Sequence, residues 1–321
     1  MSDKSAWSVI PSTLPPSERR SGMARPTHED SPAGPRPPWL KVRLQLNDDF
    51  FDLRKLVHEN KLNTVCESAS CPNIGECWSR RSLTFMILGN VCTRSCGFCD
   101  VQTGRPGSVD MDEPRRVAEA LRGLGLRYAV ITSVDRDDLP DGGAYIWAET
   151  IRAIRRYQPE LDIEVLTPDF KGDFDCVATV LDAKPTVFAH NVETVPRLHK
   201  LVRPQAAWER SLSVLKFARD YGAVAKSGIM LGLGERDDEV IEAMKALADA
   251  GVEILNLGQY MRPSSRHLPV ERWVHPDTFA YLREEGMKFG FVHIESGPLV
   301  RSSYRADEQA VKAAVARYSN G

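Results

Sequence analysis

The sequence predicts an α/β fold, a partial (β/α)6 barrel that carries an N-terminal and a C-terminal extension. Two observations predict it. Six short apolar runs of strand length alternate with six amphipathic stretches of helix length, and polar residues follow each apolar run. This alternation is typical of a parallel sheet covered by helices, either open or closed into part of a barrel.

The predicted elements succeed one another in regular order from residue 83 onward. The predicted strands are 83–88, 128–134, 163–166, 187–190, 224–231 and 254–259. The predicted helices are 114–124, 143–157, 173–183, 206–221, 236–250 and 276–289. The first helix is preceded by two acidic residues and starts at Pro114, a proline position that suits a first helical turn.

Polar residues follow every predicted strand, at the edge where the active-site loops of such folds gather. They are Cys92, Cys96 and Cys99 after the first strand, Asp135-Arg136-Asp137-Asp138 after the second, Asp169 after the third, Asn191 and Glu193 after the fourth, residues 232–235 after the fifth and Arg262 after the sixth. We expect these residues to converge on one mouth of the fold.

Four parts are predicted along the chain. Residues 1–38 are rich in Pro and Ser, carry charges of both signs and are expected to form a disordered tail. Residues 39–81 are a short polar N-terminal extension, and residues 82–290 form the barrel. Residues 291–321 are a C-terminal extension with a short helix.

Composition narrows the class of protein and its location. The 321 residues include 42 basic and 44 acidic ones, for a formal net charge of −2, so nothing draws the chain generally to nucleic acid or to an anionic membrane. No apolar run is long enough to cross a bilayer, and the N-terminus has no apolar signal-peptide core. We therefore expect a cytoplasmic protein, whose clustered cysteines bind metal or carry out redox chemistry.

Cys92, Cys96 and Cys99 form a triad with the spacing Cys-x3-Cys-x2-Cys, directly after the first strand. Three thiolates at this spacing can each bind one iron of a 4Fe–4S cluster, which leaves the fourth iron open to a small molecule. The amine and carboxylate of S-adenosylmethionine suit this iron, and an electron passed to its sulfonium releases a 5′-deoxyadenosyl radical. A structural zinc site is the alternative, but it prefers a second cysteine pair that is missing here.

This motif in a βα fold is similar to that of the radical S-adenosylmethionine (radical SAM) superfamily. Residues 228–235, Gly-Ile-Met-Leu-Gly-Leu-Gly-Glu, resemble the stretch with which that superfamily contacts adenine, with Met230 in the place of Ile. The resemblance implies cosubstrate contacts from Gly232 and Glu235. Taken alone, the glycines equally fit a turn after a buried strand.

Three more residues are candidates for cosubstrate contacts. Phe98 directly precedes the third cysteine of the triad and is placed to pack near the adenine. Asn191 and Glu193 can bond the ribose hydroxyls, although as lone polar residues after a strand they equally fit helix or turn caps.

Cys66, Cys71 and Cys77 form a further triad with the spacing Cys-x4-Cys-x5-Cys, ahead of the barrel. One triad suffices to cleave S-adenosylmethionine, so a second cluster needs a task of its own, which is to relay electrons, bind substrate or donate sulfide. The stretch Cys-Glu-Ser-Ala-Ser-Cys-Pro-Asn-Ile-Gly-Glu-Cys closely resembles the lipoyl synthase family. That resemblance covers roughly residues 60–310 and includes residues 132–139, Gly142-Gly143, Gly258-Gln259-Tyr260 and Arg301-Ser302-Ser303-Tyr304.

The resemblance implies a reaction and a division of labour between the triads. Enzymes of this family replace C–H bonds at C6 and C8 of a protein-bound octanoyl-lysine by C–S bonds, which yields the lipoyl group. The triad at 92, 96 and 99 would hold the radical-generating 4Fe–4S cluster. The triad at 66, 71 and 77 would hold an auxiliary 4Fe–4S cluster that is consumed as the source of sulfur.

A serine of the Arg-Ser-Ser-Tyr motif is implied as the fourth ligand of the auxiliary cluster. We assign it to Ser303, with Ser302 as the other candidate. An oxygen ligand suits a cluster of soft ligands poorly, so its iron would leave more readily than iron held by four thiolates. The chain departs from the commonest family pattern at Arg305, where many members carry His.

The resemblance also implies partners. The substrate proteins would be octanoylated lipoyl-carrier domains, such as the glycine cleavage H protein or the acyltransferase subunits of 2-oxoacid dehydrogenases. An electron donor such as ferredoxin or flavodoxin and an iron–sulfur carrier for cluster repair are expected as well, whereas nucleic acid and membrane are not.

The remaining polar and sulfur residues have simpler interpretations. Cys176 lies in a helical stretch beside apolar residues and is expected to be a buried, inert thiol, and the histidines form no metal-binding group. Asp135, Asp137 and Asp138 are expected to be paired or solvated, or to help bind the methionyl amine. The basic stretch 152–156 fits a solvated helix face or a dock for an acidic carrier domain.

Two other functions compete with this one. Another two-cluster radical enzyme, such as a methylthiotransferase acting on tRNA or a biotin synthase, shares part of the pattern. A methylthiotransferase needs further domains that do not fit around residues 66–304, and biotin synthase lacks the upstream triad at this spacing. A non-catalytic iron–sulfur or zinc scaffold would need neither an open iron nor polar residues after every strand.

Overall fold

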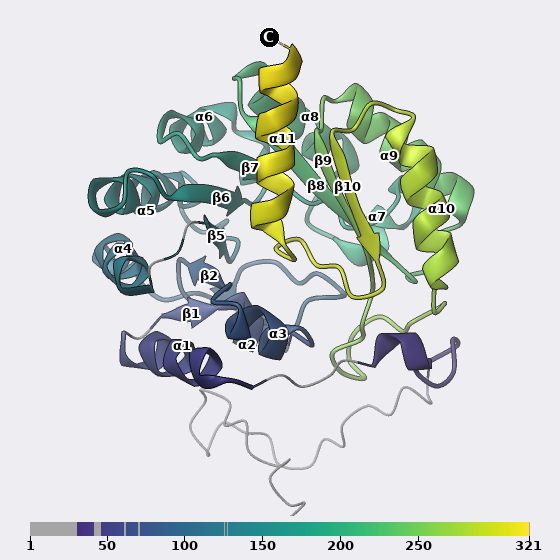
Figure 1. The fold of residues 1–321 in the computed structure, drawn as a ribbon, viewed down its shortest axis with the longest axis horizontal. Coiled ribbons are helices and arrows are strands. Elements are labelled where there is room, and N and C mark those ends of the chain that lie inside the picture. The colour runs from purple at the N-terminus through teal and green to yellow at the C-terminus, as the bar shows by residue number, and fades with distance from the viewer. Residues whose placement is uncertain are drawn as a thin grey trace, which may run out of the picture.

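A computed structural model describes residues 31–41, 46–60, 62–69, 71–124, 126 and 128–320, with only the backbone for residues 317–320. Its centre is one curved eight-stranded sheet with helices along its outer side (Figure 1). None of the helices in these ranges could span a membrane.

The sheet has the strand order β1-β2-β5-β6-β7-β8-β9-β10, and all its pairs are parallel except the one between β1 and β2. The six predicted strands are confirmed as β2 (Thr84–Ile87), β5 (Tyr128–Ser133), β6 (Asp162–Leu166), β7 (Val187–Ala189), β8 (Val224–Leu231) and β9 (Ile254–Gln259). A chain of parallel strands that is covered on its outer face by helices agrees with the predicted α/β fold class.

Two edge strands extend the sheet beyond the prediction. The antiparallel strand β1 (Asn63–Thr64) comes from the N-terminal extension, and β10 (His293–Gly297) comes from the C-terminal extension and pairs with β9. Neither segment has an apolar run, because β1 has only two residues and β10 is only half-buried over Glu295, Ser296 and Gly297. The predicted extensions therefore contribute to the same sheet as the barrel.

The six predicted helices are also present, with ends that differ by a few residues. They are α4 (Glu113–Leu124), α5 (Ala144–Tyr157), α6 (Phe174–Asp182), α8 (Trp208–Asp220), α9 (Asp237–Asp249) and α10 (Pro276–Met287). Local signals fix several of the starts. The side chain of Asp173 caps α6, and Pro276 occupies the first turn of α10.

The structure adds helices that the apolar pattern did not predict. In the N-terminal part they are η3 (Pro38–Leu40), α1 (Asp48–Glu59), α2 (Val65–Ser68) and α3 (Ile74–Ser79), and later in the chain they are η4 (Phe170–Gly172), α7 (Pro196–Val202) and α11 (Ala306–Asn320). Two short strands, β3 (Val91–Cys92) and β4 (Gln102–Thr103), pair outside the main sheet. The extension predicted as a short polar segment is thus largely helical, because α1 buries Phe50, Leu53 and Val57 on one face.

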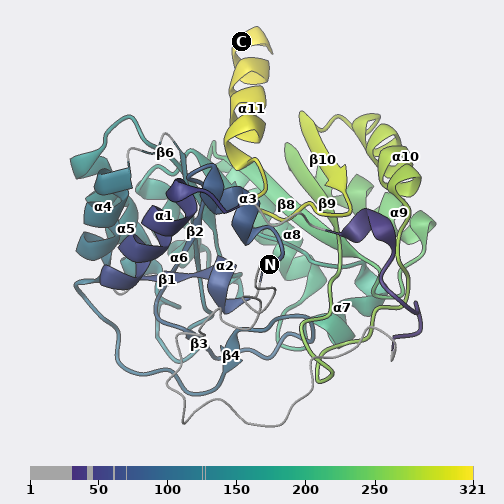
Figure 2. The ribbon, with the colours of Figure 1, turned by 60° about the horizontal axis from the view of Figure 1, so that its bottom comes forward.

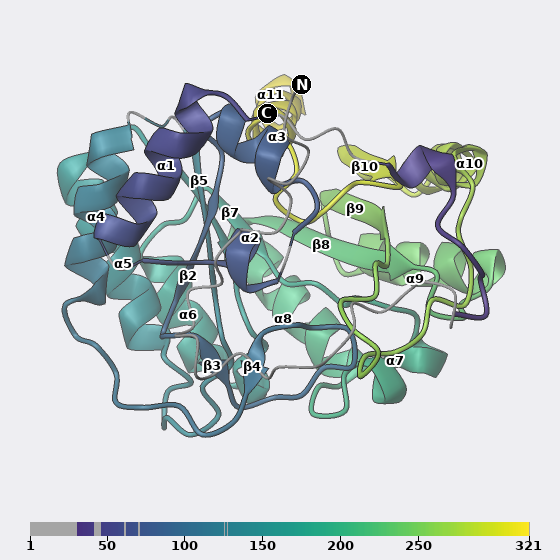
Figure 3. The same cartoon turned by 90° about the horizontal axis from the view of Figure 1, so that it is seen from below.

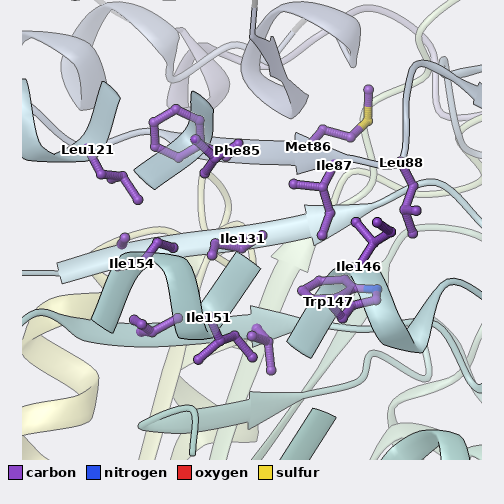
Figure 4. Packing of buried hydrophobic residues seen from close by; sticks show 14 of the residues in the cluster. Phe85, Met86, Ile87, Leu88, Leu121, Ile131, Ile146, Trp147, Ile151 and Ile154 are labelled. Atoms are coloured by element: carbon purple, nitrogen blue, oxygen red, sulfur yellow. The ribbon is translucent and has the colours of Figure 1, made fainter. Parts of the chain in front are cut away.

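The core lies between the sheet and its outer helices. Figure 4 shows the pattern for β2 and β5, whose side chains Phe85 and Ile131 meet Leu121 of α4 and Trp147 and Ile151 of α5. A second buried cluster fills the same layer beneath β8, β9 and β10. This packing fixes the strands, so that the loops at their carboxyl ends have defined positions.

Part of the segment predicted as a disordered tail is docked on the body of the protein. Residues 31–38 contact the loop after β9, where the backbone N–H of Val270 donates to Ser31 Oγ over 3.2 Å and Trp273 Nε1 donates to the carbonyl of Gly34 over 3.0 Å. Its composition gives this segment no core of its own, but an existing surface can supply the contacts. The rest of the predicted tail, residues 1–30, lies outside the described residues.

Both extensions meet at the open side of the sheet. Figures 2 and 3 show α3 beside the chain that leads from β10 to α11, and α11 packs against β10 and β5. Segments that are more than two hundred residues apart in the chain are therefore neighbours beside the loops that follow the strands.

Candidate active site

One cavity of about 500 Å³ lies at the carboxyl ends of the strands. Residues of the N-terminal extension, of the barrel loops and of the C-terminal extension all line it. Its walls include the six cysteines of the two triads, Cys66, Cys71, Cys77, Cys92, Cys96 and Cys99. Phe98, Asn191, Glu193, Ser302 and Ser303 line it too. The predicted convergence is therefore confirmed in part: residues after the first, second, fourth and sixth predicted strands line this cavity, whereas Asp169 and residues 232–235 do not.

The loop with the second triad in the chain (Cys92, Cys96 and Cys99) is hydrogen-bonded on one side to the loop after β5. The backbone N–H of Thr93 donates to the carbonyl of Asp135 over 3.0 Å, and the N–H of Asp135 donates to the Cys92 sulfur over 3.2 Å. Such N–H donors stabilise a thiolate. The position of Cys92 is thus set by the residues that end the second predicted strand.

Arg94 is the buried centre of this attachment. Its guanidinium donates to Asp137 over 2.7 and 2.9 Å and to Asp169 over 2.7 Å, and it lies 3.2 Å from Asp135. Burial would by itself raise the pKa of Asp169, but the bonds from Arg94 hold that pKa well below its usual range. The carboxylates after the second and third strands are therefore largely paired. Sequence reasoning missed the partner, because Arg94 is far from these carboxylates in the chain.

Two other loops hold the same cysteine loop from the opposite side. The N–H of Gly97 donates to Val202 at the end of α7, and the N–H of Leu268 donates to the carbonyl of Gly97, both over 2.9 Å. His267 Nε2 lies 3.0 Å from the carbonyl oxygen of Cys99. The loop is thus hydrogen-bonded on two sides, which suits a site that must hold a cluster in one position.

The segment with the first triad in the chain (Cys66, Cys71 and Cys77) is hydrogen-bonded to the Arg-Ser-Ser-Tyr segment. Asn73 Nδ2 donates to the carbonyl of Leu299 over 2.6 Å, and the hydroxyl of Tyr304 donates to Glu76 over 3.2 Å. From β9, Asn256 Nδ2 donates to the carbonyl of Ser302 over 2.9 Å. These bonds bring Ser302 and Ser303 to the wall that carries the first triad.

Gly258 of β9 has no side chain, and this lets the backbone of the serine-bearing loop lie close to β9. A Cβ at this position would overlap the carbonyl oxygen of Val300, which belongs to the backbone of the serine-bearing loop. We expect Gly258→Ala to lower the free energy of unfolding by about 1–3 kcal/mol and to displace the loop. Denaturant unfolding measures the change. Gly107→Ala is the matched control, because its Cβ would meet open space, and equal effects of the two variants would contradict the prediction.

Cys66 is buried, and the other five cysteines of the two triads are partly buried. Burial is the main cause that raises the pKa of Cys66, Cys77 and Cys96 to about 12, and the neighbouring Cys71 contributes to this rise for the first two. Thiols of this kind become thiolates when cations bind them. Among the described residues, no group of three metal-ligating side chains could hold a single metal ion. Three thiols at the spacings of each triad can each bind a different iron of one cluster.

Asn191 presents a polar atom to the cavity. Its Oδ1 is buried and has no hydrogen-bond partner among the described residues. A Cβ at Gly228 would come within 3.0 Å of this oxygen, so the glycine leaves room for it. Glu193 lies nearby with a positive φ of 68° and bonds to the backbone of Gly228 and Met230. An unpaired acceptor of this kind fits a ligand hydroxyl.

Gly232 and Glu235 do not line the cavity. Both carboxylate oxygens of Glu235 accept backbone N–H groups of its own loop, from Gly232 over 2.5 Å and from Leu233 over 2.9 Å. Gly232 has a φ of 101°, which other residues rarely adopt. Both residues thus shape the turn after β8. Because neither lines the cavity, the structure gives no support to their predicted direct contact with the cosubstrate.

The other predicted residues lie away from this cavity. Cys176 is buried on α6, as expected for an inert thiol, and burial raises its pKa to about 11. Arg155 donates to carbonyls after the end of α5, including that of Leu161 over 2.6 Å, just before β6 begins. These bonds lie at the end of the strands opposite the cavity. Arg305, which replaces the common His, lies over the ring of Tyr304 and outside the cavity walls.

The curved parallel sheet and the three-cysteine loop at its carboxyl edge define a radical SAM enzyme. The model of the Radical SAM superfamily matches residues 86–247. Solved structures agree on the fold. Streptococcus suis SuiB bound to S-adenosylmethionine has a TM-score of 0.51 at 11% identity, over 68% of this chain and 51% of that one. The maturase HydG of Carboxydothermus hydrogenoformans has a TM-score of 0.50 at 14% identity, over 83% and 70%.

Close relatives specify the family within this class. The lipoyl synthase of Rubrobacter xylanophilus is 54% identical over 94% of this chain and 95% of its own length. The lipoyl synthase of Mycolicibacterium smegmatis is 48% identical over 96% and 98%. This chain therefore belongs to the lipoyl synthase family. Membership implies a 4Fe–4S cluster, S-adenosylmethionine, an auxiliary cluster and lipoyl-carrier proteins as substrates. The chain is therefore assigned to this family in preference to a methylthiotransferase, a biotin synthase or a non-catalytic scaffold.

Proposed function

We propose that the chain inserts two sulfur atoms at C6 and C8 of a protein-bound octanoyl-lysine, and that its two triads divide this work. Cys92, Cys96 and Cys99 hold the radical-generating cluster. Cys66, Cys71 and Cys77 hold the auxiliary cluster that donates sulfur, with Ser303 as its fourth ligand. The observation that carries the proposal is that all six cysteines and this serine line one cavity.

When bound, the clusters supply the electron that cleaves S-adenosylmethionine and the sulfur that enters the product. The chain's own residues bind and orient the reactants. Asn191 and Glu193 receive the ribose hydroxyls, and Phe98 packs on the adenine. Asp135, which lines the cavity beside Cys92, accepts the methionyl amine. Burial raises the pKa of Asp135, and the charge of Arg94 opposes this rise and favours the carboxylate.

The substrate chain needs an apolar path between the two triads. Met86, Val134, Leu166, Ile229 and Met261 line the same cavity and can surround the acyl chain. Such walls exclude water from the carbon radicals that hydrogen abstraction leaves, which protects them from side reactions. Each of the two C–H bonds needs its own abstraction, so each lipoyl group consumes two molecules of S-adenosylmethionine.

The proposal extends to the partners. The octanoyl-lysine is carried by the glycine cleavage H protein or by an acyltransferase subunit of a 2-oxoacid dehydrogenase. A ferredoxin or flavodoxin supplies electrons, and an iron–sulfur carrier rebuilds the auxiliary cluster after each turnover. The family's need for a lipoyl carrier supports the first of these, and the consumption of a cluster supports the last.

One experiment tests the reaction and the metal content together. Anaerobically reconstituted protein is expected to carry two 4Fe–4S clusters, and the variant with Cys92, Cys96 and Cys99 replaced by Ala is expected to carry one. With S-adenosylmethionine, a reductant and an octanoyl-lysine peptide, the intact protein should add two sulfur atoms to the peptide, as mass spectrometry would show. Cys176→Ala is the matched control and should keep both clusters. Zinc as the only metal in protein prepared without oxygen would overturn the proposal.

A further inference from the structure

Two arginines from opposite ends of the chain line the cavity next to the first triad. Arg36 lies in the segment that precedes η3, and Arg301 directly precedes Ser302. Arg301 is close enough to Cys71 and to Arg36 for their charges to interact. Each guanidinium donates to a nearby carbonyl, that of Leu40 for Arg36 and that of Val300 for Arg301. Neither forms an ion pair with a carboxylate of the described residues.

The N-terminal strap, residues 31–41, brings Arg36 to this wall. It is bound through Ser31 and Gly34 to the loop after β9, and Trp39 contacts His275 edge to face with ring centroids 5.0 Å apart. Leu40 is fully buried at its end. These anchors lie on both sides of Arg36, so the side chain is held at the cavity wall.

Two neighbouring cations in a partly buried wall are unfavourable unless a negative charge offsets them. Burial disfavours both charges, and the charge of Arg301 disfavours that of Arg36 further, whereas the neighbouring Cys71 favours the charge of Arg301. The Nε of Arg36 is buried without a hydrogen-bond partner among the described residues. A cluster held by three thiolates and a serine oxygen carries net negative charge, and the first triad is the group that faces these cations.

We infer that Arg36 and Arg301 are positioning residues that supply the counter-charge of the auxiliary cluster, so that the N-terminal strap is part of this site. The inference rests on the proposed assignment of the first triad to that cluster. Positive charge beside an anionic cluster favours its retention, and it favours the reduced form, which is the more negative one. The two arginines thereby oppose the lability that a serine ligand introduces.

The test uses the full chain with Cys92, Cys96 and Cys99 replaced by Ala, which isolates the auxiliary cluster. In this background, Arg36→Gln is compared with Arg36→Lys and with Arg283→Gln, a substitution of an exposed arginine on α10. Two quantities are measured, the rate at which an iron chelator removes the cluster and the midpoint potential of the cluster. For Arg36→Gln we expect loss about tenfold faster and a potential lower by about 60 mV, the one-electron equivalent of a tenfold change.

The comparison separates charge from shape. Arg36→Lys keeps the charge but not the fork of the guanidinium, and we expect it to retain the potential of the parent protein. Arg283→Gln should change neither quantity. If Arg36→Gln leaves both the loss rate and the potential unchanged, or if Arg36→Lys behaves like Arg36→Gln in both, the counter-charge role is overturned. If the parent protein binds no cluster on the first triad, the proposed function itself fails, and the inference fails with it.

Discussion

Replacing Cys71 by Ala is expected to abolish the thiolated product while 5′-deoxyadenosine still forms. The second triad and its attachments to Asp135, Val202 and Leu268 do not involve this residue, so cleavage of S-adenosylmethionine should stay within about tenfold of the intact enzyme. The first triad, by contrast, loses one of its three thiolates and with it the proposed source of sulfur. Product and 5′-deoxyadenosine are measured in the same reaction by chromatography and mass spectrometry.

Reciprocal variants make this result specific. Cys96→Ala should abolish both 5′-deoxyadenosine and product, because it removes a proposed ligand of the cluster that generates the radical. Cys176→Ala, the change of a buried cysteine outside the cavity, should affect neither. A Cys71→Ala enzyme that still forms lipoyl groups would show that the first triad is not needed for sulfur insertion.

Periodicity and composition were sufficient for the central part of the fold. Buried parallel strands appear in sequence as continuous apolar runs, and their helices as amphipathic stretches, so these elements were predicted within a few residues. The edge strand β10 was not predicted, because only His293 and Ile294 of its five residues are buried and its sequence is mostly polar. The short helices α2 and α3 were not predicted either, because helices of this length show no amphipathic stripe and depend on tertiary contacts.

The candidate site was predictable where chemistry fixes the spacing of residues. The two cysteine triads are local patterns, and both line the cavity. The residues that hold them were not predictable, because their partners are distant in the chain. Arg94 pairs with Asp169, and Asn73 bonds to Leu299, contacts that no local pattern records. Glu235 shows the opposite case, in which a residue matched to a family motif is used by its own loop.

The origin of the product sulfur is the second large effect that we expect. Protein reconstituted with heavy-isotope sulfide should transfer the label to both sulfur positions of the lipoyl group, even when unlabelled sulfide is present in the reaction. The cluster is consumed, so about one lipoyl group should form per chain when nothing rebuilds the cluster. Mass spectrometry of the peptide measures both the label and the yield.

The same labelling experiment also tests the proposed serine ligand, through the variant Ser303→Ala. Ser303→Ala leaves the three thiolates of the first triad in place, so much of the labelled auxiliary cluster should remain bound. Sulfur insertion should nevertheless fail or slow, because the oxygen ligand that eases the loss of one iron is gone. The bonds from Asn256 to the carbonyls of Arg301 and Ser302 do not use the Ser303 side chain, so the loop itself should stay in place. If the product instead took its sulfur from free sulfide or from the cosubstrate, and the labelled cluster remained intact, the first triad would be an electron relay and its role as sulfur donor would have to be withdrawn.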